Sequence, residues 1–251
     1  MMNSFDLTGK TALVTGAARG LGQGIATALA AAGADVVAVS YSSSEETLQI
    51  VRSHGRQGDD IVVDLSDHSK LQETFDQALK LTGHIDILVN NAGIIRRTPA
   101  KDHSAQDWFD VIDLNLNSVF LLSQIVGNHM IARGSGKIIN ICSMLSYQGG
   151  INVPGYTASK HGVAGLTKAF ANEWAASGVQ VNGIAPGYIE TENTAPIRQD
   201  PERTQSITDR IPAGRWGTPK DIGGPAVFLA SSASDYINGH VLCVDGGWMA
   251  R

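Results

Sequence analysis

The sequence predicts one α/β domain built on a doubly wound parallel sheet, and three observations carry this prediction. Short apolar segments rich in Val, Ile, Leu and Ala alternate along the chain with longer segments of helical periodicity. The apolar segments are nearly continuous rather than alternating, as expected for strands that helices cover on both faces. No linker, low-complexity tract or repeat interrupts the 251 residues, a length that suits a single large domain.

The predicted sheet has seven parallel strands, joined by right-handed crossovers through helices on both faces. The strands are predicted at Thr11–Thr15, Val36–Ser40, Ile61–Asp64, Ile85–Asn90, Lys137–Cys142, Gln180–Ala185 and Val241–Val244. The helices are predicted at Leu21–Ala32, Ser69–Leu81, Trp108–Met130, Tyr156–Ala176 and Asp221–Ala230. One long irregular stretch, residues 186–218, is expected to form a substrate lid.

Composition excludes several classes of protein. Nineteen Lys and Arg against 24 Asp and Glu give a net charge of −5, which argues against a nucleic-acid-binding scaffold. No secretory signal and no uninterrupted run of about 18 apolar residues is present, so we expect a cytoplasmic protein without a membrane span. Cys142 and Cys243 lie in apolar runs, which predicts reduced, buried thiols. The histidines lack metal-site spacing, and no catalytic metal is expected.

A glycine-rich turn follows the first predicted strand and leads directly into a helix. Gly16, Gly20 and Gly22 are spaced G-x3-G-x-G, and glycine lets a backbone turn tightly and approach a pyrophosphate at a helix N-terminus. A turn without a ligand is the alternative. A second cluster, Asn90–Gly93, ends the fourth strand. Ligands of open parallel sheets bind at the carboxyl ends of strands where the strand order reverses, so both clusters should border one crevice.

Tyr156 and Lys160 stand four residues apart on one face of a predicted helix. A phenol with a pKa of about 10 exchanges protons poorly at neutral pH. An ammonium about 4 Å away, at an effective dielectric near 20, supplies roughly the 4 kcal/mol that would bring this pKa to about 7. A packed tyrosine beside a solvated amine is the alternative.

Two further polar residues lie near this pair in the predicted fold. Ser143 closes the fifth strand, where a hydroxyl can bond a substrate oxygen or simply stabilise a turn. Asn115 interrupts an apolar helix, where its amide needs partners and can kink the helix or hold a water. Neither residue decides the function alone, but their joint occurrence with Tyr156 and Lys160 does.

With these residues in place, the whole chain resembles the single-domain branch of the short-chain dehydrogenase/reductase family. The motifs that carry the resemblance are Thr15–Gly22, Asp64-Leu65, Asn90–Gly93, Asn115, Ser143, Tyr156-x3-Lys160 and Pro186-Gly187 with Thr191. It implies a Rossmann fold with Tyr156 as general acid/base and Ser143 polarising the substrate oxygen. It also implies that Lys160 lowers the tyrosine pKa and bonds the nicotinamide ribose, while Asn115 holds a proton-relay water.

The resemblance also implies a nicotinamide dinucleotide site. Its residues would be Gly16, Arg19, Gly20, Leu21, Gly22, Ser40, Asp64, Leu65, Asn91, Ala92, Gly93, Tyr156, Lys160, Pro186, Gly187, Ile189 and Thr191. An acid at the end of the second strand would favour NAD(H), but that end reads Val39-Ser40-Tyr41-Ser42. Arg19 can pair with a phosphate or remain solvated, so the sequence leaves NAD(H) and NADP(H) both open.

Within the family, the chain is similar to a subgroup that acts on keto-deoxy sugar acids of the 2-dehydro-3-deoxy-D-gluconate type. The segments that carry this similarity are Ser143–Gly150, Asn172–Trp174, Ile211–Gly217 and Val244–Trp248. The alternatives are a 3-oxoacyl-thioester reductase, a gluconate 5-dehydrogenase, and a dinucleotide-binding sensor without catalysis.

The partners expected are a small-molecule substrate and, from the resemblance, three further copies of the chain in a homotetramer. The substrate candidates from the sequence are Met144 and Gln148, beside Ser143, and Arg96, just past the fourth strand. An arginine can bind the carboxylate of a sugar acid through two hydrogen bonds, and Arg97, Arg203 and Arg215 are further candidates of this kind. A solvated surface position is the alternative for each arginine.

Overall fold

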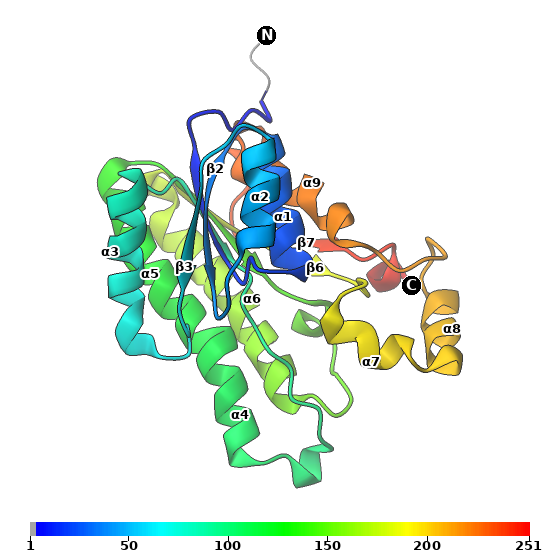
Figure 1. Cartoon of the computed structure of the whole chain (residues 1–251). Helices are drawn as coiled ribbons and strands as arrows, with labels where there is room; N and C mark the ends of the chain where they lie inside the picture. Colours follow the sequence, from blue (N-terminus) through cyan, green and yellow to red (C-terminus); the bar gives the residue numbers. More distant parts are fainter. Residues whose placement is uncertain (1–3) are drawn as a thin grey trace.

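The computed structural model describes residues 4–251, which form a seven-stranded, fully parallel sheet in the order β3-β2-β1-β4-β5-β6-β7 (Figure 1). The strands are β1 (Thr11–Thr15), β2 (Asp35–Ser40), β3 (Gly58–Val62), β4 (Ile87–Asn90), β5 (Gly136–Ile141), β6 (Val179–Pro186) and β7 (Val241–Val244). The order reverses between β1 and β4, which pair as neighbours. This confirms the predicted doubly wound α/β fold.

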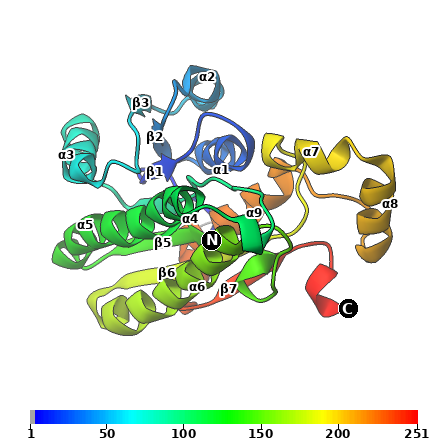
Figure 2. The ribbon, with the colours of Figure 1, turned by 90° about the horizontal axis from the view of Figure 1, so that it is seen from below.

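Helices cover both faces of the sheet (Figure 2). They are α1 (Gly20–Ala31), α2 (Glu45–Ser53), α3 (Leu71–Thr82), α4 (Ala105–Ile112), α5 (Ser118–Arg133), α6 (Pro154–Trp174), α7 (Ala195–Arg198), α8 (Pro201–Arg210) and α9 (Pro219–Ala230). One core cluster joins the sheet to α1, α2 and α9, and another joins it to α3, α5 and α6. The sheet is therefore buried on both sides, which explains its nearly continuous apolar strands.

In the first half of the sheet, one predicted strand was misplaced and one helix was not predicted. The third strand is Gly58–Val62 rather than Ile61–Asp64, because the edge strand pairs its backbone with β2 from Val36↔Gly58 to Ser40↔Val62. Helix α2 was not predicted at all. Its apolar contribution is only Leu48 and Val51, a signal too short to separate one helical turn from a loop.

The predicted helix Trp108–Met130 is continuous in direction but changes its winding. A π-helical turn, Asp113–Asn117, separates α4 from α5. The whole helical run, Ala105–Arg133, is long and apolar enough by length and composition to cross a membrane, a test that core helices of globular domains also pass. Leu122, Val126 and Met130 nevertheless lie buried against the sheet, as in the core helix of a globular domain.

The segment 186–218, named the lid segment below, is not irregular as predicted, because it contains α7 and α8. Asp200 caps α8 by accepting a hydrogen bond from Arg203 N, and Pro201 begins the helix. Ile207 anchors α8 in a small apolar cluster that also contains Met144, Ile211, Trp216 and Trp248. Figure 1 shows α7 and α8 beside the C-terminus, to one side of the sheet.

The two cysteines differ in environment. Cys142 is buried, as predicted, whereas Cys243 is exposed, which corrects the sequence expectation. Cys243 lies on β7, the last strand of the sheet, where fewer elements cover the side chains. Both thiols are free.

A buried amide network ties the centre of the sheet to the helices above it. Asn90 Nδ2 donates to Asn140 Oδ1 and to Ser123 Oγ, each over 2.9 Å. Asn140 Nδ2 in turn donates to Thr167 Oγ1 over 2.9 Å. The network thereby joins β4, β5, α5 and α6 near the carboxyl ends of the strands, and these three hydrogen bonds are buried in the core.

Replacing Asn140 with Ala should lower the free energy of unfolding by about 2 kcal/mol, because it removes two buried hydrogen bonds and leaves a small cavity. Urea denaturation of the variant and the wild type measures this difference. Asn128, exposed on α5, provides the matched control, and Asn128→Ala should change stability by less than about 0.5 kcal/mol. Equal effects of the two substitutions would contradict a structural role for the network.

Candidate active site

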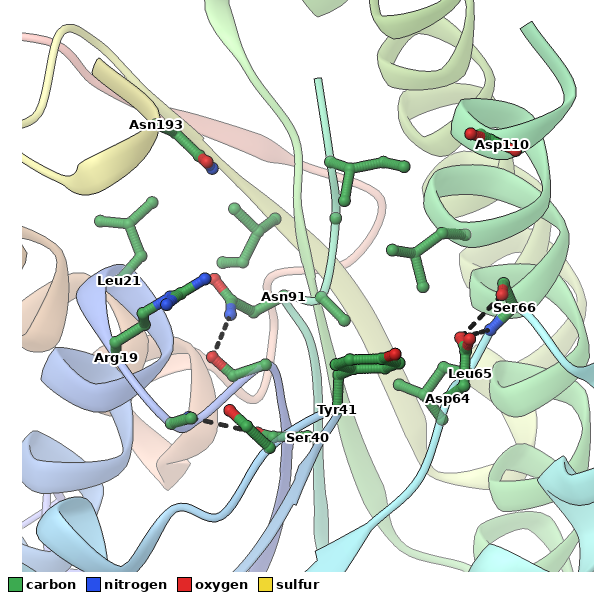
Figure 3. Close-up of a pocket in the computed structure, with 18 of the residues that line it drawn as sticks. Arg19, Leu21, Ser40, Tyr41, Asp64, Leu65, Ser66, Asn91, Asp110 and Asn193 are labelled. Carbon is green, nitrogen blue, oxygen red and sulfur yellow. Dashed lines mark hydrogen bonds between the residues drawn. The ribbon is translucent and has the colours of Figure 1, made fainter. Parts of the chain in front are cut away.

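A cavity of about 710 Å³ opens at the carboxyl ends of the central strands (Figure 3). It contains most of the residues predicted for the dinucleotide site. These are Gly16, Arg19, Leu21, Ser40, Asp64, Leu65, Asn91, Ala92, Gly93, Tyr156, Lys160 and Thr191. The cavity thus lies at the point where the strand order reverses, as the sequence predicted.

The glycine-rich turn takes its shape from contacts that exclude side chains. A Cβ on Gly22 would lie 2.1 Å from Gly16 O, so only glycine lets α1 pack this closely on the turn. Gly16 and Gly20 have φ of +65° and +59°, a region that L side chains rarely adopt. Gly20 and Gly22 do not line the cavity, but they set the path of the backbone that does. Ala18 N donates to Ser40 Oγ over 3.1 Å, which fastens the turn to β2.

Thr15 joins the ends of β1 and β4. Its Oγ1 accepts hydrogen bonds from Asn91 N (2.9 Å) and Ala92 N (3.0 Å) and donates to Val89 O (3.2 Å). The side-chain amide of Asn91 donates to Thr15 O and Gly16 O, a contact visible in Figure 3. Asn91 therefore fixes the two clusters against each other, in addition to lining the cavity.

Asn115 is completely buried in the π-helical turn. Its Oδ1 accepts from Ile94 N and its Nδ2 donates to Ile94 O, both over 2.9 Å, and Nδ2 also lies 3.3 Å from Ser159 Oγ. A Cβ on Gly93 would lie 3.1 Å from Asn115 Oδ1. The amide therefore holds the loop after β4 in place, and the π-turn is the local distortion that its polar side chain suggested.

Tyr156 and Lys160 line one wall of the cavity, whereas Ser143 does not line it. Ser143 Oγ accepts from Leu145 N over 3.1 Å, and its side chain acts to lower the pKa of Tyr156. Lys160 is buried, with its Nζ 5.6 Å from the centroid of the Tyr156 ring. Lys160 Nζ donates to Ile141 O over 2.6 Å.

Burial affects the protonation equilibria of both Tyr156 and Lys160. Removal from water raises the pKa of Tyr156, while the Ser143 side chain and the Arg97 guanidinium act to lower it. Burial lowers the pKa of Lys160 to about 8. The Lys160 ammonium donates to a backbone carbonyl rather than to the phenol. The effect of Lys160 on the tyrosine pKa, which the sequence analysis gave before any cost of desolvation, stays a prediction.

The substrate candidates separate into two groups. Arg96 lines the cavity but is paired with Asp110 (3.1 Å) and Asp107 (3.5 Å). Met144 is buried in the cluster beneath α8, and Gln148 Oε1 accepts from Trp248 Nε1 over 3.1 Å. Neither Met144 nor Gln148 lines the cavity, because the lid segment and the C-terminal turn cover them.

Of the other arginines, Arg215 is bound to Asp221 through Nη1 and Nη2, at 2.9 and 2.7 Å. Arg203 is exposed on α8. Arg97 differs from both, because its Nη2 donates to Asn193 O over 2.9 Å and its charge acts on Tyr156.

Besides Gly20 and Gly22, three predicted cofactor residues lie outside the cavity wall. Pro186 and Gly187 end β6, where a Cβ on Gly187 would lie 2.6 Å from Asp245 Cα, so this glycine allows close packing. Ile189 is buried in the core and bridges to Gly217. Thr191, the last predicted cofactor residue in the chain, does line the cavity.

The cavity also contains residues that sequence reasoning did not assign. Tyr41 and Ser42 follow Ser40 at the end of β2, and their position there was the available signal. Three polar residues reach the cavity from more distant elements: Asp110 from α4, Asp113 from the π-helical turn and Asn193 from the lid segment. No local sequence pattern predicts that these elements approach the cavity. Among residues 4–251, no group of three or more His, Cys, Asp and Glu lies together as a metal site would require.

Comparisons with known proteins extend over almost the whole chain. A family model described as enoyl-(acyl carrier protein) reductase matches residues 16–249. A 2-dehydro-3-deoxy-D-gluconate 5-dehydrogenase of Bacillus subtilis is 59% identical over 250 residues, which are 99% of this chain and 98% of that protein.

Two solved structures are also close in sequence. A putative 2-deoxy-D-gluconate 3-dehydrogenase from Agrobacterium tumefaciens with bound NADP is 52% identical, with a TM-score of 0.94 and coverage of 99% and 100% of the two chains. A putative NAD(P)-dependent gluconate 5-dehydrogenase from Beutenbergia cavernae with NADP at low occupancy is 50% identical, with a TM-score of 0.95 and the same coverage.

Lys160→Met should be more stable than the wild type at pH 7, because the wild type then buries a charged ammonium at a cost. The folded pKa of about 8 lies below the unfolded value of 10.5, so the unfolded state binds more protons between these values. Wild-type stability therefore rises relative to Lys160→Met from pH 8 to 10.5, by about 3 kcal/mol at most. Chemical denaturation at several pH values measures the difference in unfolding free energy between Lys160→Met and the wild type. If the advantage of Lys160→Met grew with pH, the lowered pKa of Lys160 would be refuted.

Proposed function

The chain belongs to the short-chain dehydrogenase/reductase family, and from this premise we propose that it interconverts a keto-deoxy sugar acid of the 2-dehydro-3-deoxy-D-gluconate type with its diketo form. The observation that supports the reaction most directly is that Tyr156 and Lys160 share the wall of the crevice, with the Ser143 side chain acting on the Tyr156 hydroxyl. The substrate class rests on the Bacillus subtilis relative.

The crevice suits a nicotinamide dinucleotide, which when bound supplies or accepts the hydride. At Gly16 the backbone of the glycine-rich turn borders the cavity without an intervening side chain. Helix α1 begins at Gly20, so its N-terminus lies beside the same cavity. Asp64 and Leu65 form the opposite wall, as Figure 3 shows. The turn would hold the pyrophosphate, and this wall would hold the adenine.

Tyr156 is the proposed proton donor and acceptor for the substrate oxygen. Ser143, whose side chain acts to lower the pKa of Tyr156, would polarise the same oxygen. Lys160, with a pKa near 8, can lose or gain a proton close to neutral pH. Lys160 would therefore tune Tyr156 and bond the nicotinamide ribose, while Asn115 would hold the loop that carries Gly93 and Ile94 beside them.

NADP(H) is the proposed preference. The end of β2 presents Ser40, Tyr41 and Ser42 to the cavity, without the carboxylate that would repel a 2′-phosphate. Arg19 lines the same cavity and supplies a cation for that phosphate. The Agrobacterium tumefaciens and Beutenbergia cavernae structures hold NADP, which supports this choice.

Arg97 is the proposed partner of the substrate carboxylate. Its guanidinium acts on Tyr156 and forms one hydrogen bond to Asn193 O, so its remaining N–H groups are available to an anion. Arg96, the candidate from the sequence, is committed to Asp107 and Asp110 and would instead hold α4 in place. The lid segment, through Asn193, would then close over the bound acid.

A gluconate 5-dehydrogenase activity is the second candidate, because the Beutenbergia cavernae structure carries that description. An acyl-thioester reductase is a weaker candidate, since only the broad family model points to it.

A cytoplasmic homotetramer is the proposed assembly. Exposed apolar side chains on α4 and α5, among them Phe109 and Phe120, suit contact with a second copy.

Tyr156→Phe should lower kcat on the keto-deoxy sugar acid by about 10²–10⁴-fold, because the variant lacks the acid/base hydroxyl. Nicotinamide absorbance measures turnover against a panel of keto-deoxy hexonates, gluconate and acetoacetyl thioesters. Turnover retained by the variant would contradict the role of Tyr156. A wild type that binds dinucleotide but turns over no member of the panel would favour a sensor.

Arg97→Ala should raise KM for the sugar acid by about tenfold to a hundredfold, because a charge-assisted hydrogen bond contributes about 1.5–3 kcal/mol. The KM for the dinucleotide should change little. Lys101, an exposed cation on the same loop, provides the matched control, and Lys101→Ala should leave both constants unchanged. A raised KM in the control as well would point to a general loss of positive charge rather than to a specific carboxylate contact.

A further inference from the structure

An exposed ion pair bridges the glycine-rich turn and the lid segment. Arg19 Nε lies 3.0 Å from Glu192 Oε2, and the two side chains are 74% and 70% exposed. The backbone beside this pair is also close, because a Cβ on Gly20 would lie 3.7 Å from Thr191 Cγ2. An ion pair with this exposure contributes little to the free energy of unfolding, so its position calls for another explanation.

Arg19 is the cation that a 2′-phosphate would need. Two other cationic side chains line the cavity, and both already have partners, either carboxylates or a backbone carbonyl. Arg96 is paired with two aspartates, and buried Lys160 donates to Ile141 O. Figure 3 shows Arg19 extending over the turn toward Asn91, and among residues 4–251 its one ion pair is with Glu192.

We propose that Glu192 is a cofactor-selectivity residue, whose carboxylate competes with the 2′-phosphate of NADP(H) for the Arg19 guanidinium. The inference rests on the proposed function and deepens its cofactor assignment. A carboxylate and a phosphate oxygen make the same kind of charge-assisted hydrogen bond to a guanidinium. NADP(H) therefore has to displace Glu192 to reach Arg19, whereas NAD(H), with a hydroxyl in place of the phosphate, does not.

The competition predicts a specific pattern of affinities. Without the Glu192 charge, Arg19 is free and NADPH binds more tightly, while the affinity for NADH changes by less than twofold. Exposed ion pairs of this type correspond to about a two- to fivefold effect on a binding constant. Because both side chains are exposed, the effect should shrink as salt screens the pair.

Fluorescence titration of NADPH and NADH measures this without any choice of substrate. The proteins are the wild type, Glu192→Gln, Arg19→Ala, the double variant, and Glu202→Gln as a matched control for loss of one charge in the lid segment. Glu202 is exposed near the start of α8 and, among residues 4–251, forms no ion pair. Each titration is run at low and at high ionic strength.

The expected result is a two- to fivefold tighter NADPH complex for Glu192→Gln at low salt, no change for Glu202→Gln, and no effect of Glu192→Gln in the Arg19→Ala background. An unchanged NADPH affinity would overturn the proposal. So would an equal gain for NADH, which would indicate a general opening of the lid segment, or a gain that persists without Arg19. A wild type that binds neither nucleotide overturns the proposed function too, whereas normal binding without sugar-acid turnover overturns only the substrate.

Discussion

The junction between β1 and β4 is the contact on which the candidate site depends. Thr15 Oγ1 accepts hydrogen bonds from two backbone N–H groups of the loop after β4. In the other direction, the side-chain amide of Asn91 donates to the carbonyl oxygens of Thr15 and Gly16. Parallel strands end at one edge of a sheet, so this junction fixes both loops where the strand order reverses. The cavity between them is therefore a consequence of the sheet topology.

Burial sets the chemistry at the cavity wall. Removal from water raises the pKa of Tyr156 and lowers that of Lys160, so both shifts favour the neutral forms. The Ser143 hydrogen bond and the Arg97 charge oppose the shift at the tyrosine. Arg97 thus connects the acid/base tyrosine with the lid segment. Its charge favours the phenolate of Tyr156, and its guanidinium donates a hydrogen bond to Asn193 O in the lid segment.

The lid segment is held by two kinds of contact. Apolar packing of Ile207, Trp216 and Trp248 anchors α8 near the C-terminal turn, and the ring of Tyr188 lies within 5.1 Å of both indoles. Above the cavity the contacts are polar and exposed, from Arg19 to Glu192 and from Arg97 to Asn193. Exposed polar contacts of this kind contribute little to stability and are screened by salt, whereas the apolar base of the segment is packed.

The sequence by itself determined the parallel sheet and most of the predicted cofactor residues that line the crevice, because apolar strands and glycines at fixed positions follow from local geometry. It also determined the pairing of Tyr156 with Lys160, since residues four apart share a helix face. Only the tertiary structure decided that Lys160 donates to Ile141, that Gln148 and Met144 are covered by Trp248, and that Glu192 meets Arg19. These contacts join residues far apart in the chain, and their partners depend on how the elements pack, which no local pattern encodes.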